Sequence, residues 1–239
     1  MEYKKLVRRL KTLSNPKNVA GMARFGINPK NTLGIAVPEL RKIAKEIKKD
    51  HKLAQQLWDS GIHEARILAS MIDDPKLVTG KQMDKWVRGF DSWDVCDQTC
   101  MNLFDKTPFA SKKALLWTKS STEFVKRAGF SLMACLAFHD KKAKDSDFVK
   151  FFPAIKRASI DERNFVKKAV NWALRQIGKR NKKLNKEAVK VAGEIQKIDS
   201  KSAKWIANDA IRELVSPAIK GRLDKNSAKD YNKIRCAGF

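Results

Sequence analysis

The sequence predicts an all-α fold built from helical repeats, and three observations support this prediction. Apolar residues recur at every third or fourth position along most of the chain, which is typical of helices with one buried face. Strict apolar–polar alternation and Asn-Gly or Asp-Gly hairpin turns, the usual signs of strands, are absent from the sequence. In addition, a string of five residues returns in nearly identical form 41 positions later.

The apolar periodicity predicts about a dozen helices and no sheet. The first contains Leu6, Leu10 and Leu13, and the second begins near Val37, where Pro38 suits the first turn of a helix. The other helices, each bounded by apolar residues, are expected over residues 63–72, 83–90, 95–104, 110–117, 124–138, 148–155, 165–177, 188–198 and 203–215.

Three helix starts are expected where a side-chain oxygen can accept a hydrogen bond from a free backbone N–H group. The capping residues are Ser92, Asp161 and either Ser121 or Thr122. Linkers between the predicted helices are short, so the helices follow one another closely along the chain.

The repeated string is Phe124-Val-Lys-Arg-Ala128, which returns as Phe165-Val-Lys-Lys-Ala169, and each copy opens a long predicted helix. A weaker echo starts at Glu64. A period of about 40–47 residues per helix pair is that of HEAT and armadillo repeats. We therefore expect a single HEAT-like repeat domain over residues 1–215, a curved α-α superhelix rather than a bundle, followed by a charged tail over residues 216–239.

The charge of the chain is strongly unbalanced. Lys and Arg number 51 against 26 Asp and Glu, for a formal net charge of +25, while 43% of the residues are apolar. That apolar content excludes a disordered basic tail. Because self-repulsion destabilises a compact basic protein, the surplus indicates an anionic partner, with nucleic acid ahead of anionic membranes and acidic proteins. A source whose proteins are all Lys-rich is the alternative explanation.

Neither a membrane segment nor a disulfide framework is expected. No stretch approaches the about 20 apolar residues that cross a bilayer, and the basic N-terminus lacks the apolar core of a signal peptide. The four cysteines, Cys96, Cys100, Cys135 and Cys236, form no CxxC and have no His-rich neighbourhood, which argues against a zinc site. We expect a cytoplasmic, nucleoid-associated monomer without a metal or cofactor.

Stacked repeats create a concave face from one helix of each pair. If the matching helices line that face, a group of cationic residues gathers there: Arg66, Lys126, Arg127, Lys167, Lys168 and Arg175. Such a basic trough can follow duplex DNA by neutralising its phosphates.

Trp93 and Asp97 are four residues apart, so a helix places an indole and a carboxylate side by side. Core packing is the alternative for Trp93. Asp94 lies in the first turn, where a carboxylate complements the helix dipole, but Asp97 lies beyond that turn and lacks this explanation.

Two further features combine cations with aromatics or with acids. Arg127 is either a phosphate ligand or the ion-pair partner of Glu123 on a solvated helix face. Trp172 lies four residues after Lys168 and three before Arg175, an arrangement that suits nucleic acid, although core packing is again the alternative.

Several short sequence motifs are informative when their order and spacing along the chain are considered together. They are Met22-Ala23-Arg24-Phe25, Leu33-Gly34-Ile35, Pro38-Glu39-Leu40-Arg41, Ser92-Trp93-Asp94-Val95-Cys96-Asp97, Phe124-Val-Lys-Arg-Ala128 and Phe165-Val-Lys-Lys-Ala-Val-Asn-Trp172-Ala-Leu-Arg175. Together they resemble the HEAT-like-repeat DNA alkylation repair glycosylases, the AlkD-type family, over roughly residues 22–198.

The resemblance implies hydrolysis of the N-glycosidic bond of cationic alkylated bases, such as 3-methyladenine and 7-methylguanine, in duplex DNA. It implies an active face of Trp93, Asp97, Arg127 and Trp172, and Ser92 stands where the best-known members have a second Trp. Asp97 would stabilise an oxocarbenium-like sugar and position water, while the indoles pack against the deoxyribose. Arg127 would clamp a phosphate, with Lys126, Lys168, Arg175 and Arg66 as further DNA ligands.

Two other functions remain open from the sequence. One is a non-catalytic HEAT-repeat nucleic-acid-binding protein, and the other is a protein-interaction scaffold. Asp97 favours the enzyme, because a carboxylate inside a phosphate-binding trough weakens binding but assists base excision.

Overall fold

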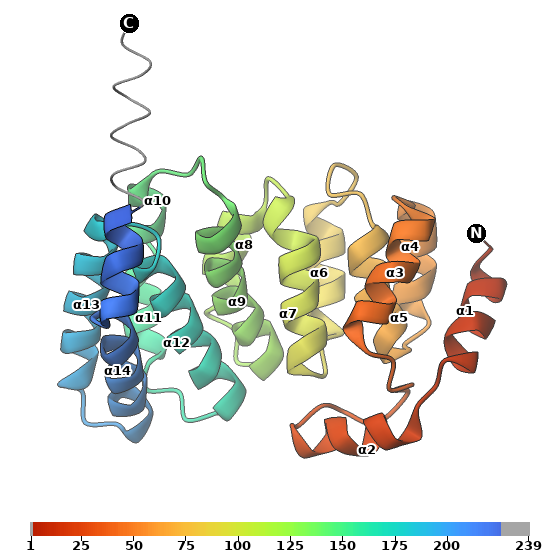
Figure 1. The fold of residues 1–239 in the computed structure, drawn as a ribbon, viewed down its shortest axis with the longest axis horizontal. Coiled ribbons are helices and arrows are strands. Elements are labelled where there is room, and N and C mark those ends of the chain that lie inside the picture. Colours follow the sequence, from red (N-terminus) through yellow and green to blue (C-terminus); the bar gives the residue numbers. More distant parts are fainter. Residues whose placement is uncertain (1, 226–239) are drawn as a thin grey trace, which may run out of the picture. The chain divides into compact units, whose positions relative to one another are not determined.

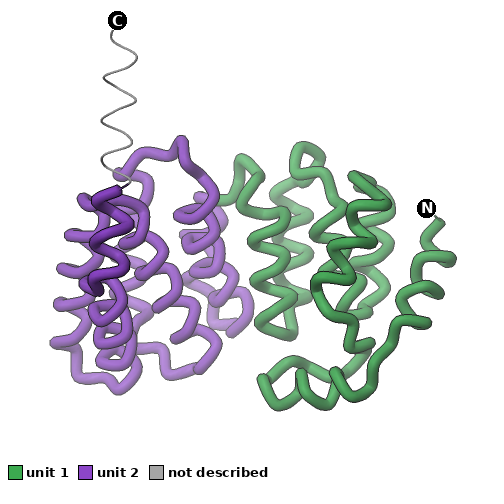
Figure 2. The backbone as a smooth tube through the Cα atoms, in the orientation of Figure 1, with its two compact units in different colours: residues 1–110 green, residues 111–239 purple. Residues whose placement is uncertain are grey.

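The computed structural model describes residues 2–225, and within them the all-α prediction is confirmed: helices and loops make up the fold and no strand occurs (Figure 1). The chain divides into two compact units, unit 1 over Met1–Ala110 and unit 2 over Ser111–Phe239 (Figure 2). The single domain expected over residues 1–215 stays a prediction.

Unit 1 is organised around α5. Its helices are α1 (Tyr3–Thr12), α2 (Pro16–Arg24), α3 (Val37–Ile47), α4 (His51–Asp59), α5 (His63–Ile72), α6 (Gly80–Arg88) and α7 (Trp93–Asn102), followed by the 3-10 turn η1 (Phe104–Lys106). Helix α5 contacts α3, α4 and α7, and most of its residues are buried. The next helix, α8 (Ala110–Trp117), begins at the last residue of unit 1.

Unit 2 is organised around α12. Its remaining helices are α9 (Glu123–His139), α10 (Asp145–Val149), α11 (Phe152–Ala158), α12 (Asn164–Gly178), α13 (Lys182–Gln196) and α14 (Lys201–Leu214). Helix α12 contacts α9, α11, α13 and α14. Residues 217–225 of the predicted tail are helical, and residues 226–239 lie outside the described part of the chain.

The repeated string is built into this packing. Phe124 near the start of α9 and Phe165 near the start of α12 lie in contact, with ring centroids 5.5 Å apart. Equivalent residues of successive repeats therefore pack on each other, as expected for stacked helical repeats.

The predicted helix starts are only partly right. Ser92 and Thr122 are the N-cap residues of α7 and α9, but neither side chain bonds to the free N–H groups of its helix. The Ser92 hydroxyl instead accepts from the Asn28 N–H at 2.9 Å. Asp161 is not a cap, because α12 begins at Asn164 and the Asp161 carboxylate accepts hydrogen bonds from Arg163.

Helices α2 and α4 were not predicted, and one predicted helix is divided into two in the structure. Helix α2 buries none of its residues and therefore lacks an apolar stripe, whereas α4 carries one that the sequence analysis missed. The helix predicted over residues 148–155 is divided into α10 and α11. Pro153 explains the division, because it has no N–H group to donate to the carbonyl oxygen of Val149, the last residue of α10, and it lies in the first turn of α11.

Among residues 2–225, no helix combines the length and apolar character that a membrane span requires. In the same residues, no group of three or more His, Cys, Asp or Glu side chains is arranged to hold a metal ion.

Candidate functional site

Helix α7 carries both members of the predicted indole–carboxylate pair. Trp93 is its first residue, and Asp97 lies one turn further along; both are half-buried. Core packing, the alternative role considered for Trp93, is found for two other tryptophans of unit 1. Trp58 and Trp86 are buried, and their rings stack with centroids 4.1 Å apart. Trp93 differs from them, since its indole reaches a cavity.

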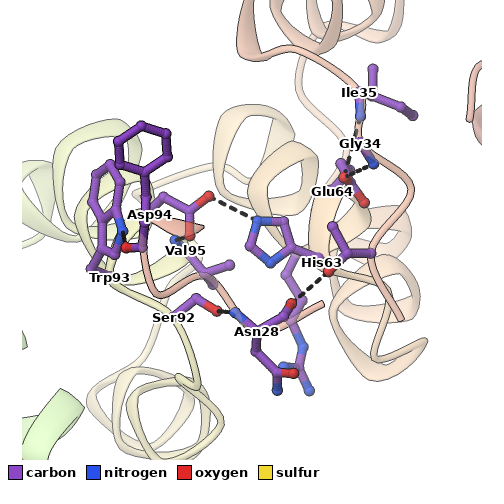
Figure 3. A network of polar contacts seen from close by, with 12 residues as sticks. Asn28, Gly34, Ile35, His63, Glu64, Ser92, Trp93, Asp94 and Val95 are labelled. Carbon is purple, nitrogen blue, oxygen red and sulfur yellow. Dashed lines mark hydrogen bonds and ion pairs between the residues drawn. The ribbon is translucent and has the colours of Figure 1, made fainter. Parts of the chain in front are cut away.

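This cavity of unit 1 has a volume of about 460 Å³ and lies among α2, α5, α7 and the loop between α2 and α3. Its lining is mainly apolar, and Trp93 and Phe25 form part of it. The Trp93 Nε1 group donates a hydrogen bond to the Phe25 carbonyl oxygen at 3.1 Å, which fixes the plane of the indole (Figure 3).

An imidazole–carboxylate pair also lines the cavity. His63 Nε2 lies 2.8 Å from Asp94 Oδ2, and His63 is only 4% exposed (Figure 3). Burial acts to lower the pKa of His63, but the hydrogen bond and charge of Asp94, together with the charges of Glu64 and Asp91, outweigh it, so this pKa is raised above its ordinary value. The sequence analysis missed the pair and assigned Asp94 to the helix dipole, because its partner is 31 residues away.

The loop on the opposite side of the cavity is held by a second buried acid. The Glu64 carboxylate accepts hydrogen bonds from three consecutive backbone N–H groups, those of Leu33, Gly34 and Ile35, at 2.8, 2.6 and 3.3 Å. Gly34 has a φ of +77°. The string Leu33-Gly34-Ile35 thus corresponds to a backbone turn that wraps a carboxylate and shapes the cavity wall.

Arg66 of α5 is directed into unit 1. Its Nη1 donates to the Gly89 carbonyl oxygen at 3.0 Å, and its guanidinium carbon lies 5.5 Å from the centre of the Trp58 ring. Asp91 is 3.8 Å from Nη1. These contacts give Arg66 a structural role, and DNA binding by this residue stays a prediction.

In unit 2, the predicted residues of α9 contact the start of α12. Arg127 is 6% exposed and its Nη1 donates to the Phe165 carbonyl oxygen at 2.6 Å. Lys126 forms an ion pair of 3.0 Å with Asp161, whose carboxylate also binds Arg163. The hydrogen bonds from Arg163 and then Lys126 lower the pKa of Asp161 to about 2, against the effect of its partial burial.

The predicted residues of α12 differ in how much solvent they meet. Lys168 is exposed and Trp172 is half-buried. Arg175 forms ion pairs with Glu213 at 2.7 Å and Asp209 at 3.5 Å. Of these three, Lys168 is the cation that forms no ion pair with an acid of residues 2–225.

The sequence analysis also overlooked an exposed aromatic of unit 2. Trp205 of α14 is 41% exposed, and the Lys167 ammonium lies 5.2 Å from the centre of its ring. Trp205 is 40 positions after Phe165 in the sequence, so the repeat spacing could have drawn attention to it.

Comparison with known proteins connects these features to a family. The profile of the DNA alkylation repair enzymes matches residues 6–214. None of the curated proteins matches the chain. A solved structure from a family of proteins related to the HEAT-like repeat DNA glycosylases, with affinity for branched DNA structures, superposes with a TM-score of 0.75. The two sequences are 22% identical, and the superposition covers 93% of this chain and 96% of the solved chain.

A designed armadillo repeat protein in complex with a (KR)4 peptide is 12% identical to this chain and covers 80% of it and 81% of the designed chain. Its TM-score of 0.37 is too low for a conclusion about fold or function. The likeness at 22% identity shows the fold, a HEAT-like helical repeat as predicted. The match over residues 6–214 shows the family, which the sequence motifs had indicated. The chain belongs to the DNA alkylation repair enzyme family.

Proposed function

We propose that the chain is a monofunctional DNA glycosylase that removes cationic alkylated purines, such as 3-methyladenine and 7-methylguanine, from duplex DNA. The observation that carries this proposal is the half-buried carboxylate of Asp97 one helical turn from Trp93, in a member of a DNA alkylation repair family with a net charge of +25. A strongly basic protein that only binds DNA gains nothing from such a carboxylate.

The chemistry requires little beyond electrostatics. Alkylation of a ring nitrogen makes the base a cationic leaving group, which departs with the electron pair of the glycosidic bond and becomes neutral. The sugar then carries the positive charge, which the Asp97 carboxylate would oppose. Water adds to the anomeric carbon and gives up a proton, and Asp97 is the group proposed to accept it. The faces of Trp93 and Trp172 would pack against the deoxyribose while it is cationic.

DNA would be held chiefly through its phosphates. Lys168 is exposed and would bind a phosphate directly. Lys126 and Arg175 would exchange their present acidic partners for phosphate oxygens. Arg127 would hold the phosphate beside the lesion. Arg66 would contribute only if DNA displaced its bond to the Gly89 carbonyl.

One alternative has a specific observation in its favour. The solved structure with a TM-score of 0.75 comes from a family related to the glycosylases and with affinity for branched DNA structures. A chain of the same fold could therefore bind DNA without removing bases.

Base release decides between these functions. Duplex DNA treated with a methylating agent is incubated with the protein, and free bases are separated and quantified. We expect release of 7-methylguanine and 3-methyladenine. Uracil, tested in a separate uracil-containing duplex, should be a poor substrate because it carries no charge. Asp97→Asn should lose at least about 100-fold in rate, comparable to removing one electrostatic contact in an active site, and should still bind DNA.

The matched control is Asp199→Asn, which removes the same charge from a fully exposed carboxylate of unit 2. Wild-type activity in Asp97→Asn would show that another group supplies the catalysis. A wild-type protein that releases no base yet prefers branched DNA over a plain duplex would establish the alternative.

A further inference from the structure

A second cationic feature of unit 2 lies at the C-terminal ends of α9 and α12. It is a pocket of about 220 Å³. Its principal lining residues are Phe138, Lys141, Gln176, Lys179, Arg180 and Arg222, which we call the α9–α12 pocket. Four of these six are cationic, and no acidic side chain from the described residues lines it.

Most of this charge is uncompensated. Lys179 forms an ion pair of 2.9 Å with Glu213. Within residues 2–225, no carboxylate lies within ion-pair distance of Lys141, Arg180 or Arg222. Burial lowers the pKa of Arg180, although Asp140 and Asp145 act in the opposite direction from a distance. The pocket therefore concentrates positive charge that is partly removed from water.

Helix stability explains part of this arrangement. Arg180 donates to the carbonyl oxygens of Ala137 and Ala143 at 3.2 and 2.9 Å, and Arg222 donates to that of Lys179 at 2.6 Å. Cations at helix C-termini are favourable for this reason. A guanidinium has five N–H donors, however, so both arginines keep donors for a ligand.

The pocket continues the face of α12 that carries Trp172. Trp172, Gln176 and Lys179 follow at i, i+4 and i+7, which places them on one side of the helix. With its amide oxygen turned toward them, Gln176 accepts from Trp172 Nε1 and Lys179 Nζ, at 3.2 Å each. Seven residues of helix span about 10 Å, so the pocket lies about that distance along α12 from Trp172.

The aromatic member of the pocket indicates which anion it suits. Phe138 is 57% exposed, and the Lys141 ammonium lies 5.3 Å from the centre of its ring. An exposed ring beside cations offers a sugar or base a surface to pack on. An inorganic anion has no sugar or base that could pack against such a ring.

We propose that the α9–α12 pocket binds a backbone phosphate of DNA about 10 Å along α12 from the nucleotide at Trp172. Arg180 and Arg222 donate to the phosphate oxygens, Lys141 and Lys179 add charge, and Phe138 flanks the adjoining sugar. The inference rests on the proposed function for the choice of DNA as ligand, but it does not require that a base be removed.

The test is the double variant Lys141→Gln/Arg222→Gln, which leaves Arg180 and its two backbone contacts in place. The control is Lys112→Gln/Lys190→Gln, which removes two exposed charges of unit 2 outside the pocket. Affinity for an undamaged fluorescent duplex is measured by anisotropy from about 50 to about 200 mM NaCl. We expect the pocket variant to bind several-fold more weakly than the control, with a slope of log affinity against log salt shallower by about 0.9.

Equal affinities and slopes for the two variants would overturn the proposal. A parallel titration uses inorganic phosphate at constant ionic strength. If the pocket variant loses phosphate binding but keeps the duplex affinity of the control, the pocket takes a small anion and the assignment to DNA is wrong. Should the double variant fail to fold by circular dichroism, Lys141→Gln alone against Lys112→Gln gives the same comparison, because within residues 2–225 the Lys141 side chain forms no hydrogen bond or ion pair and its ammonium lies over the exposed Phe138 ring.

Failure of the proposed function gives a different result. Wild-type protein that releases no methylated base would refute the glycosylase, and the salt dependence of the two variants would still decide the pocket.

Discussion

His63 and Asp94 join the start of α5 to the first turn of α7 through a hydrogen bond of 2.8 Å in a nearly dry environment. Asp94 follows Trp93 directly, so this bond and the bond from Trp93 to the Phe25 carbonyl hold adjacent residues of α7. The indole proposed to face the sugar is thus positioned by a charge pair that the sequence does not reveal.

The first prediction concerns the ionisation of this pair. Asp94→Asn removes the hydrogen-bonding carboxylate that does most to raise the pKa of His63 and leaves the burial that lowers it, so the pKa of His63 should fall, although the charges of Glu64 and Asp91 remain. Titration of the imidazole by NMR measures the pKa in both proteins. An unchanged pKa of His63 in the variant would mean that Asp94 is not the cause.

The free energy of unfolding should depend on pH through the same imidazole, that of His63. Because folding raises the pKa of His63, its contribution is complete below the unfolded pKa of about 6.5 and is lost as pH rises through the folded value. Wild-type protein should therefore lose unfolding free energy across this range in urea titrations. Asp94→Asn should weaken this dependence and cost about 1–3 kcal/mol at pH 6.

A second prediction concerns the turn around Glu64. Gly34→Ala should destabilise the protein by at least about 1–2 kcal/mol, since φ is positive there and the new Cβ would collide with the Asn15 carbonyl oxygen. Gly21→Ala is the control, because nothing lies within 4 Å of its Cβ and it lies inside α2. That change should stabilise by up to about 1 kcal/mol. Thermal unfolding compares the two, and equal shifts would contradict the steric argument.

A third prediction separates stability from DNA binding at Asp161. Asp161→Asn should cost about 1 kcal/mol at pH 7 after solvent screening, because two cations lose their acceptor. The lowered pKa means that this contribution is present above the unfolded pKa of about 3.9 and lost as pH falls through about 2. Wild type and variant should therefore converge in stability in strong acid.

The same variant should bind duplex DNA more tightly. Lys126 is then free to meet a phosphate, which steepens the salt dependence of log affinity by about 0.9. Asp147→Asn is the control, because it adds the same net charge at the exposed pair with Lys150. An equal gain in the two variants would show that overall charge, and not Lys126, is responsible.

Local pattern was enough to predict much of the fold. Helices α5 and α8 occupy the predicted ranges 63–72 and 110–117. Helix α8 buries an apolar stripe with helical spacing, whereas α5 is buried over most of its length. Helix α2 has no buried residue and so gives no such signal. The caps predicted at Ser92 and Asp161 failed because these side chains bond to residues outside the first turn.

The site was predictable only where its residues are neighbours in sequence. Trp93 and Asp97 share α7 because four residues make one turn of helix. The pair His63–Asp94, the contact of Glu64 with the loop at Gly34, and the ion pairs of Lys126 and Arg175 join residues 30 to 38 positions apart, which no local sequence pattern reveals. A count of lysines and arginines does not show which of them already face an acid.

The last prediction concerns Ser92, which stands where the resembling glycosylases have a second tryptophan. Its side chain is fully buried, and its hydroxyl accepts the Asn28 N–H at 2.9 Å. Ser92→Ala should cost about 1–3 kcal/mol, because that N–H loses its acceptor. Ser92→Trp should cost at least as much, since an indole overfills the site, and should not increase base release. A stable Ser92→Trp variant with faster release would instead mean that this position opens toward DNA, and would place it beside Trp93 in the proposed active face.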